Sequence, residues 1–409
     1  MRNLARQKRN LERKKMLDVK LEEASEKMGS KGKLDWKKLT ALCPEHLYAL
    51  LADVNISKKD SWEERVVKVL HLVRLHQITE YDPVQCFRVQ TRFCIYNLAY
   101  FDFEKESKAM PGPPFLELNS YDHMLLESSV NIVSLTCESD MDYPIKIFGT
   151  VLARDEVDYK CVYLFKRDKD DPQVINSPKD MLTLTDPCRG LAVTDSMFFE
   201  INLRMECDSG DESVLSKGVT EHNACVSDGK LVTKFLTSWH STVRLEYTHV
   251  PSAVIATLSV SVVHGASDFI GEVVAWTSGN RNEIILHDSK VAGTSTELGA
   301  AGSVALSRRL VAVPVHEELF ICISVGYDSG HEAACFEGTL RHLDNCRTFC
   351  QGLYMLEVKA EWVGNTRREN VYRCKLNGNG DTRWVGVRTV TLKTIVVVGG
   401  HESPKKFVK

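Results

Sequence analysis

Residues 148–153, FGTVLA, and residues 270–275, IGEVVA, are two versions of one strand-length pattern that lie 122 positions apart. Further segments repeat with the same or nearly the same spacing: 162–164 with 284–286, 199–203 with 321–325, and RGLAV at 189–193 with RLVAV at 309–313, two positions out of phase. Self-similarity at a fixed spacing indicates an internal repeat. We therefore expect residues 130–205 and 254–326 to share one strand order, with Gly149 equivalent to Gly271.

The pattern of apolar and polar residues in the repeats predicts the fold class. From residue 130 onward, short apolar or alternating runs are separated by Asp, Gly, Asn, Ser and Pro, which is typical of strands. A sheet with one apolar face must be covered by another layer. We predict a mainly β protein with two related β-sandwich-like halves. Ten side chains should point inward: Val151, Val162, Leu164, Phe199, Ile201, Val273, Ile284, Leu286, Ile321 and Ile323.

The chain outside the repeats divides by composition. Leucines at helical spacing follow a basic N-terminal run, and the sequence MPGPP at 110–114 is compatible with neither a helix nor a central strand. Between the repeats, the polar residues 206–230 are expected to form an exposed connection. The predicted segments are a basic polar helix or tail at 1–30, a helical hairpin at 31–80, a connector at 81–128, a β domain at 129–362 and a basic C-terminal extension at 363–409.

Composition and charge exclude some classes of protein. The chain is 43% hydrophobic and 26% charged, as in ordinary globular proteins, and its net charge of -3 gives no overall bias towards nucleic acid or anionic membrane. The basic termini are the only segments that the sequence predicts could bind nucleic acid. The alternative is that both termini are solvated tails. The basic residues are Arg2, Arg6, Lys8, Arg9, Arg13, Lys14 and Lys15, and Arg367, Arg368, Arg373, Lys375, Arg383, Arg388, Lys393, Lys405, Lys406 and Lys409.

The sequence also predicts the cellular compartment of the protein. It contains no run of about eighteen apolar residues, so we expect no membrane span. The first residues lack the apolar stretch of a secretory signal, and the thirteen cysteines are odd in number and irregularly spaced. Reduced thiols in a cytoplasmic protein are expected, with a nuclear location as the alternative.

An ordered set of segments supports a family resemblance. These are SVNIVSLTCESDMDYPIKIFGTVLARD, DYKCVYLFKRDKDDPQVI, LTLTDPCRGLAVTDSMFFEINL, EIILHDSKVAG and RRLVAVPVHEELF. Together they resemble the domain of unknown function 6598, a plant family expanded in grasses, over about residues 119–362. The resemblance implies a predominantly β domain of plant origin that sometimes adjoins an rRNA N-glycosidase domain. The glycosidase run of the type Glu-Ala-x-Arg-Phe is not found in this sequence, so that activity does not carry over.

Five aspartates are weak candidates for a metal site. They bracket the predicted strand at 161–165, and they would offer calcium its preferred oxygen ligands if their loops met at one end of a sandwich. Four cations lie among them, which favours a solvated charge run, and the equivalent loop of the second half, 277–281, has no carboxylate. The candidates are Asp155, Asp158, Asp168, Asp170 and Asp171.

Two other groups of reactive residues are better explained by structure. The set His331, Cys335, His342, Cys346 and Cys350 matches no zinc-finger spacing. His287, Asp288 and Ser289 are adjacent, and neighbouring residues of a strand point to opposite faces, so they cannot assemble a catalytic triad by themselves. We predict no catalytic residues, no metal ligands beyond the weak aspartates, and no cofactor.

The favoured function is a non-enzymatic binding or scaffold module for an unknown protein or small ligand. An enzyme or accessory partner linked to rRNA N-glycosidase activity is one alternative, and it rests only on the family resemblance. A calcium- or lipid-binding β-sandwich is the other, and it rests on the aspartates and the basic extension.

Overall fold

The chain forms two compact units, residues 1–77 and 78–409. The computed structural model describes residues 61, 68, 73–75, 77–82, 87–94, 101–206, 212–226, 229–238, 240–265, 267–291, 293–326, 334–366, 371–372 and 385–386. In the first unit, the described residues 68, 73–75 and 77 are helical. The predicted tail at 1–30, most of the predicted hairpin, and the basic residues of both termini lie outside the described residues.

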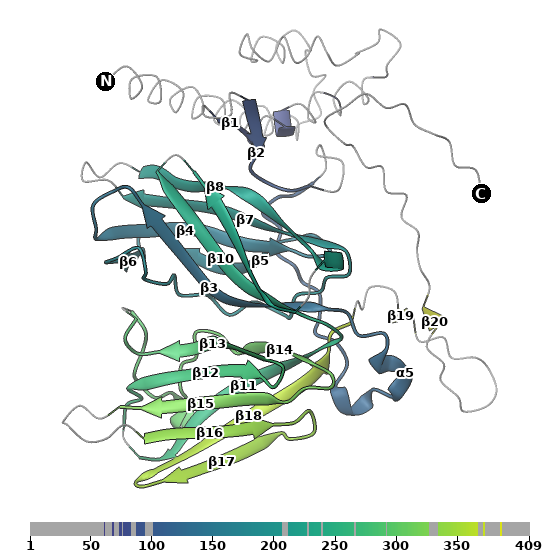
Figure 1. The fold of residues 1–409 in the computed structure, drawn as a ribbon, viewed down its shortest axis with the longest axis vertical. Helices are drawn as coiled ribbons and strands as arrows, with labels where there is room; N and C mark the ends of the chain where they lie inside the picture. The colour runs from purple at the N-terminus through teal and green to yellow at the C-terminus, as the bar shows by residue number, and fades with distance from the viewer. Residues whose placement is uncertain are drawn as a thin grey trace, which may run out of the picture. The chain divides into compact units, whose positions relative to one another are not determined.

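The second unit is mainly β, and its first half is a sandwich of two antiparallel sheets (Figure 1). One sheet has the order β5-β4-β7-β8, with β6 also paired to β4, and the other has the order β3-β10-β9. Apolar side chains of both sheets share one core. The strands are β3 (Ser129–Ser139), β4 (Ile145–Arg154), β5 (Val162–Arg167), β6 (Gln173–Ile175), β7 (Ser196–Glu206), β8 (Glu212–Asn223), β9 (Leu231–Thr237) and β10 (Ser241–Val250).

The second half is a sandwich with its own core. Its sheets have the orders β13-β12-β15-β16 and β14-β11-β18-β17. The strands are β11 (Ala253–His264), β12 (Gly271–Thr277), β13 (Asn280–Asp288), β14 (Leu310–Pro314), β15 (Leu319–Val325), β16 (Ala334–Leu340), β17 (Cys346–Gln351) and β18 (Tyr354–Gly364).

The sheets β5-β4-β7-β8 and β13-β12-β15-β16 have the same strand order and nearly the same register, whereas the other sheet has three strands in the first half and four in the second. Val151 pairs with Ile201 in the first half, and Val273 pairs with Ile323 in the second, so both partners shift by the same number of residues. The bulge between β4 and β5 also recurs between β12 and β13, just after Val151 and Val273. The internal repeat predicted from the sequence is confirmed.

The repeated glycine has a steric cause. A Cβ atom on Gly149 would overlap the carbonyl oxygen of Asn202, and one on Gly271 would overlap that of Ser324. Both oxygens belong to the neighbouring strand, β7 or β15, at equivalent positions. Only glycine therefore allows the two strands to approach closely at this point.

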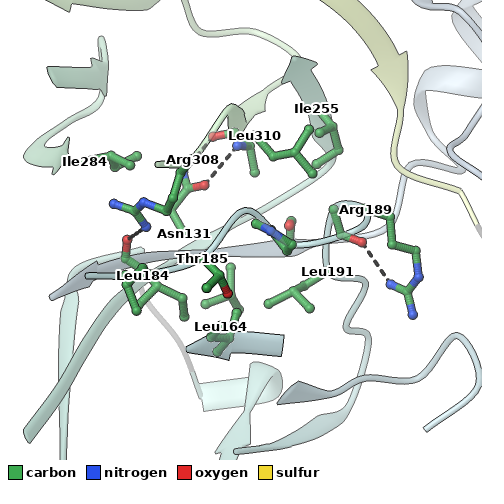
Figure 2. A pocket seen from close by; sticks show the side chains of 16 residues that line it. Asn131, Leu164, Leu184, Thr185, Arg189, Leu191, Ile255, Ile284, Arg308 and Leu310 are labelled. Atoms are coloured by element: carbon green, nitrogen blue, oxygen red, sulfur yellow. Dashed lines mark hydrogen bonds between the residues drawn. The ribbon is translucent and has the colours of Figure 1, made fainter. Parts of the chain in front are cut away.

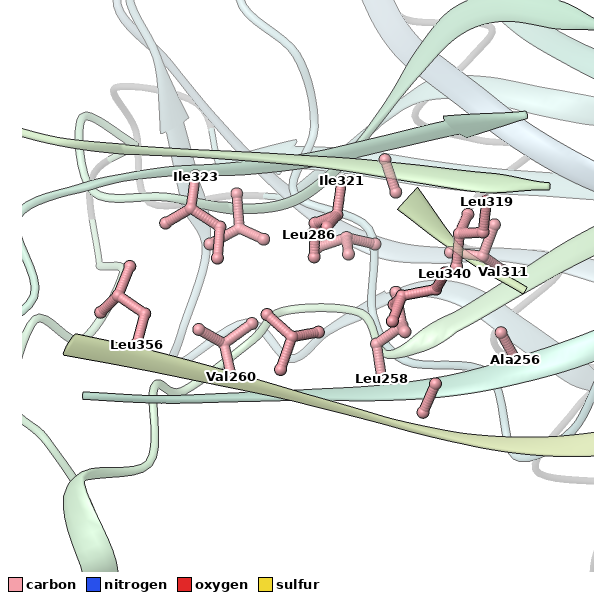
Figure 3. Packing of buried hydrophobic residues seen from close by; sticks show 14 of the residues in the cluster. Ala256, Leu258, Val260, Leu286, Val311, Leu319, Ile321, Ile323, Leu340 and Leu356 are labelled. Atoms are coloured by element: carbon pink, nitrogen blue, oxygen red, sulfur yellow. The ribbon is translucent and has the colours of Figure 1, made fainter. Parts of the chain in front are cut away.

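The predicted inward positions are confirmed as well. All ten side chains are buried, and none is more than 4% exposed. Figure 3 shows Leu286, Ile321 and Ile323 facing Leu258, Val260 and Leu356 across the second sandwich. The alternation of each strand thus fills the space between its two sheets.

The expectation for residues 206–230 was wrong in part, because the 12-residue strand β8 runs through the middle of this segment. It is an edge strand whose inward positions are filled by Leu215, Gly218 and His222. Gly218 leaves room for the Leu236 side chain of β9. With only one aliphatic side chain pointing inward, the strand lacks the apolar alternation that would have indicated it.

The remaining described elements are short. The connector region contains β1 (Thr79–Asp82), β2 (Phe87–Gln90), the 3-10 helix η1 (Phe115–Glu117) and α5 (Ser120–His123). Two further 3-10 turns are η2 (Ala224–Val226) and η3 (Ala300–Gly302), and the C-terminal extension contributes the strand pair β19 (Val371–Tyr372) and β20 (Val385–Gly386). Among the described helices, none is long and apolar enough to span a membrane.

Candidate binding site between the two sandwiches

Edge strands of the two sandwiches meet and are joined by hydrogen bonds. Strand β3 of the first sandwich contacts β13 and β14 of the second. The Asn131 side chain on β3 donates to the carbonyl of Ala312 at 2.7 Å and accepts from its N–H at 2.8 Å. Asn131 is 7% exposed. A buried amide therefore pairs with β14 as a neighbouring strand would.

Arg308 is the second link between the sandwiches. Its Nη1 donates to the carbonyl of Ile132 at 2.6 Å, and its Nε donates to the carbonyl of Ile285 at 3.0 Å. These oxygens belong to β3 and β13. Beside it, Arg309 pairs with Asp186 through Nε at 2.7 Å. The interface is held by specific polar contacts as well as by a small apolar cluster.

The charge of Arg308 has no counter-ion in contact. The residue is 6% exposed, and no carboxylate of the described chain lies within ion-pair distance of it. Burial lowers the pKa of Arg308 to about 10, and the charge of Asp186 only partly opposes this effect. The guanidinium stays protonated at neutral pH, so a buried positive charge lies between the sandwiches.

A cavity of about 40 Å³ adjoins this charge. Arg308, Ser129 and Thr185 line it together with apolar side chains, which include Leu184 and Ile255 (Figure 2). The hydroxyl oxygens of Ser129 and Thr185 are buried and lack a hydrogen-bond partner within the described part of the chain. Buried polar atoms are usually satisfied, so these two hydroxyls are available to a group bound in the cavity.

A second arginine, Arg189, lies at the opposite end of the cavity (Figure 2), and its charge is already compensated. It contacts both carboxylate oxygens of Asp155, at 2.5 and 2.8 Å, and lies 3.7 Å from Asp158. Burial alone would lower the pKa of Arg189, but Asp155 and then Asp158 raise it above its ordinary value. The uncompensated charge of the cavity therefore belongs to Arg308.

The five predicted aspartates are not brought together. Asp155 and Asp158 precede β5 and bind Arg189 and Lys160. The other three follow β5, whose six residues span about 20 Å. Asp171 pairs with Arg167 there. The loops lie at opposite ends of one strand, and the described residues contain no group of three or more His, Cys, Asp or Glu arranged to hold a metal ion.

The other candidate groups are also dispersed. The half-buried His342 contacts the rings of Trp362 and Phe115, and desolvation lowers its pKa to about 4. Cys335 lies on β16, whereas Cys346 and Cys350 lie on β17 of the other sheet, and His331 is outside the described residues.

The adjacent residues His287, Asp288 and Ser289 each bind backbone. His287 Nδ1 lies 3.0 Å from the carbonyl of Ala305. Asp288 accepts from the N–H of Lys290 at 2.9 Å, and Ser289 Oγ accepts from the N–H of Gly271 at 2.9 Å. All three side chains therefore bind backbone atoms at the end of β13 and the turn that follows it.

Sequence reasoning missed Arg308, Ser129 and Thr185. Two consecutive arginines before a strand ordinarily indicate a solvated strand end. The one available signal was the phase shift of two residues between RGLAV and RLVAV, which occurs beside Arg308 and Arg309. It marked a local departure from the repeat without showing what the departure does.

Comparison with known proteins identifies a family. Residues 129–360 match the family model DUF6598, described as a domain of unknown function. A search of curated proteins finds no match.

Two solved structures are similar over part of the chain. Human GIVD cytosolic phospholipase A2 has 10% identity and a TM-score of 0.18, with 57% of this chain and 32% of the phospholipase covered. A pair of C2 domains from extended synaptotagmin 2 has 6% identity and a TM-score of 0.21, with 64% of this chain and 96% of that chain covered. The chain thus spans about a third of the phospholipase. Both TM-scores are too low to inform fold or function.

Proposed function

Because the chain belongs to the DUF6598 family, a domain of unknown function, we propose a function from its geometry: it is a binding module that holds a small oxyanion between its two sandwiches. The observation that carries this proposal is the buried Arg308, which lines a cavity without a carboxylate partner in the described chain. The ligand would supply the negative charge that the protein lacks at this place.

The donors of the cavity suit an oxyanion. Arginine has five N–H groups, and two of those on Arg308 already bind carbonyls, which leaves three. The hydroxyls of Ser129 and Thr185 add two further donors. Hydrogen bonds between charged partners are stronger than neutral ones, and a buried charge is costly until it is paired. An oxyanion would satisfy the arginine and both hydroxyls together.

Size and charge narrow the ligand class. A water molecule needs about 10–15 Å³ when volume is measured in this way. A cavity of about 40 Å³ therefore takes about three water-sized groups. That is enough for a carboxylate or for most of a phosphate, and too little for a whole nucleotide or sugar. Since one uncompensated cation is present, we expect one negative charge on the bound group.

Titration of the purified chain with acetate and with inorganic phosphate, in chloride buffer, tests the proposal. A bound oxyanion should raise the free energy of unfolding by about 1.4 kcal/mol at ten times its Kd. Arg308→Gln should abolish this gain. Arg309→Gln, next to it but 59% exposed and paired with Asp186, should keep it. The two anions distinguish a carboxylate site from a phosphate site.

The variants also separate binding from the general stabilisation that phosphate gives to any folded protein. That general effect should be equal in Arg308→Gln and Arg309→Gln. If both variants respond as the unmodified chain does, or if no anion is bound at millimolar concentration, the cavity holds only water and the proposal is wrong.

A further inference from the structure

The sheets β5-β4-β7-β8 and β13-β12-β15-β16 are equivalent in the repeat, but their outer faces differ in what covers them. On the first sandwich, residues 92–94 and 101–107, named the covering segment below, lie over strands β4, β5 and β7. The segment pairs with the chain just before β5 through a parallel bridge between Glu106 and Cys161. A stretch of the same chain thus closes this face.

The contacts of the covering segment are specific. Arg92 and the backbone N–H of Phe93 bind Glu200 on β7, at 3.1 and 2.7 Å. The Phe93 ring stacks on Phe198, with centroids 3.4 Å apart and an angle of 8°. The carbonyl of Phe103 accepts from Arg154 at 2.7 Å. Under this cover, Arg154 is fully buried and Glu200 is 4% exposed.

The repeat identifies the equivalent surface of the second sandwich. Arg154 and Phe198 are cross-strand partners on β4 and β7, and Trp276 and Phe320 are the partners at the same register on β12 and β15. Their rings stack on each other, with centroids 5.8 Å apart and an angle of 8°. Cys322 takes the place of Glu200. Trp276 and Phe320 provide for each other the ring contact that Phe93 provides for Phe198.

This second face is not closed by any described segment. Trp276, Phe320 and Cys322 are half-buried, in contrast to the fully covered Arg154 and Glu200. Val274 lies opposite Cys322 on one side and Ile285 on the other, and it is itself buried, so the accessible part of the face is formed by the half-buried residues around it. The centre of the outer face is therefore apolar and aromatic, which is unusual for a sheet surface that faces water.

The rim of the same face is acidic. Glu272 and Asp288 are directly opposite each other on β12 and β13, and like charges in this position repel. Burial raises the pKa of Glu272, and the charges of Asp288 and Glu283 add to the effect, with Lys290 partly opposing it. Glu337 faces Cys322 from β16. Within the described chain, none of these four carboxylates is in an ion pair.

We propose that the outer face of the second sandwich binds an extended segment of another protein that carries a cationic residue beside an aromatic one. The first sandwich provides the template, because Arg92 and Phe93 show how such a pair lies on this sheet. An incoming cation would relieve the repulsion between Glu272 and Asp288, while Trp276, four residues farther along β12, would contact the aromatic residue beside that cation. The incoming aromatic ring would stack beside Phe320.

Selection from a phage-displayed library of random short peptides, with the full chain as bait, tests this proposal. Selected peptides should be enriched in Arg or Lys next to an aromatic residue. Trp276→Ala should weaken the consensus peptide by about tenfold or more, as expected for a central aromatic contact. Glu272→Lys should do the same. It removes an existing repulsion, so the fold is retained. Phe235→Ala, on an aromatic of β9 that is 63% exposed and therefore more accessible than Trp276, should leave affinity unchanged.

The cysteines report where the peptide binds. The sulfur atoms of Cys322 and Cys335 lie 3.4 Å apart on the proposed face, whereas Cys346 and Cys350 lie on β17 of the opposite sheet. The bound peptide should slow alkylation of the first pair and leave the second pair unaffected. Arg308→Gln should bind the peptide normally, which keeps this test independent of the oxyanion proposal.

Three results would overturn the proposal. One is a library selection without enrichment. Another is peptide affinity that is unchanged in both Trp276→Ala and Glu272→Lys. The third is self-association of the purified chain that Trp276→Ala abolishes, since the occupant would then be a second copy.

Discussion

Two arginines near one cavity differ only in their partners, and this difference decides their roles. Arg189 has Asp155 and Asp158 within reach, so its charge is compensated inside the first sandwich. Arg308 has only carbonyl oxygens among its described contacts. A compensated ion pair contributes to the structure, whereas an uncompensated buried charge can be stabilised by a ligand of opposite charge.

His222 gives a residue-level prediction about pH. It is 2% exposed, with the hydroxyl of Tyr247 3.1 Å from Nδ1 and His249 3.4 Å from Nε2. Burial, and to a lesser degree His249, lowers the pKa of His222 to about 4. The unfolded chain, with an ordinary histidine pKa of about 6.5, therefore binds the proton more readily. Stability should be complete above about pH 6.5 and should fall as the pH drops towards 4.

Urea denaturation across this range measures the effect. The contribution of His222 should reach at most about 3 kcal/mol at the acid end. His222→Gln should flatten the dependence on pH, although the buried His287 and the half-buried His342, whose pKa values burial also lowers, keep part of it. An identical slope in His222→Gln would show that this imidazole is not the titrating group.

Single residues also mark where sequence reasoning ends. The inward aliphatic positions such as Val151 and Ile323 were predictable, because a strand repeats its faces every two residues. The role of Asp155 was not, because its partner Arg189 is distant in the sequence. In the sequence these carboxylates resemble a calcium-binding loop, whereas in the folded chain Asp155, Asp158 and Asp171 form ion pairs. Arg308 was hidden for the same reason, since burial depends on which strands meet.

Among the elements, the paired strands β4 and β7 and their equivalents β12 and β15 are the most closely matched part of the repeat. The pattern of sequence around Gly149 and Gly271 was sufficient to place them, because alternation and close strand approach are local properties. Strand β8 could not be placed in this way. Its inward Gly218 and His222 fit only because Leu236 and Tyr247 lie opposite them, and those residues come later in the chain.

The equivalence of these glycines can be tested directly. Gly149→Ala and Gly271→Ala should each lower the free energy of unfolding by about 1–3 kcal/mol, because the new Cβ would force two strands apart. Gly149 should be the more sensitive, since its φ of 116° also disfavours other residues. Gly326→Ala, where the nearest atom to a new Cβ is 3.6 Å away, should change stability by less than about 0.5 kcal/mol. Equal losses at all three positions would contradict the steric explanation.

Over the whole second unit, the two copies have diverged in ways that complement each other. The first sandwich has its large sheet closed by its own chain, and the second presents the equivalent sheet with an aromatic centre and an acidic rim. The junction between them adds the uncompensated Arg308, which neither sandwich would bury alone. Duplication thus provides one scaffold with two different surfaces and a cavity that depends on both halves.

The coupling of the two sandwiches depends on few contacts, and this leads to the last prediction. Each sandwich has its own large core, whereas the apolar cluster at the junction contains only four buried residues. Asn131→Ala would leave the N–H and carbonyl of Ala312 without their present partner. An unsatisfied buried polar group costs about 1–3 kcal/mol, and this cost should fall on the junction and not on either core.

Calorimetry distinguishes the outcomes. We expect one unfolding transition for the unmodified chain and two for Asn131→Ala, because the variant loses one of the few polar links between the sandwiches. Asn223→Ala should keep one transition, since within the described residues that side chain accepts from the nearby N–H of Cys225 and makes no hydrogen bond to the other sandwich. A single, unshifted transition in Asn131→Ala would mean that Arg308, the apolar contacts and the hydrogen bonds of Asn365 to the carbonyls of Ser128 and Leu191 suffice to couple the halves. Two transitions would show that the β3–β14 contact holds the two sandwiches together. Oxyanion binding should then depend on the same contact, because the walls of the cavity come from both sandwiches.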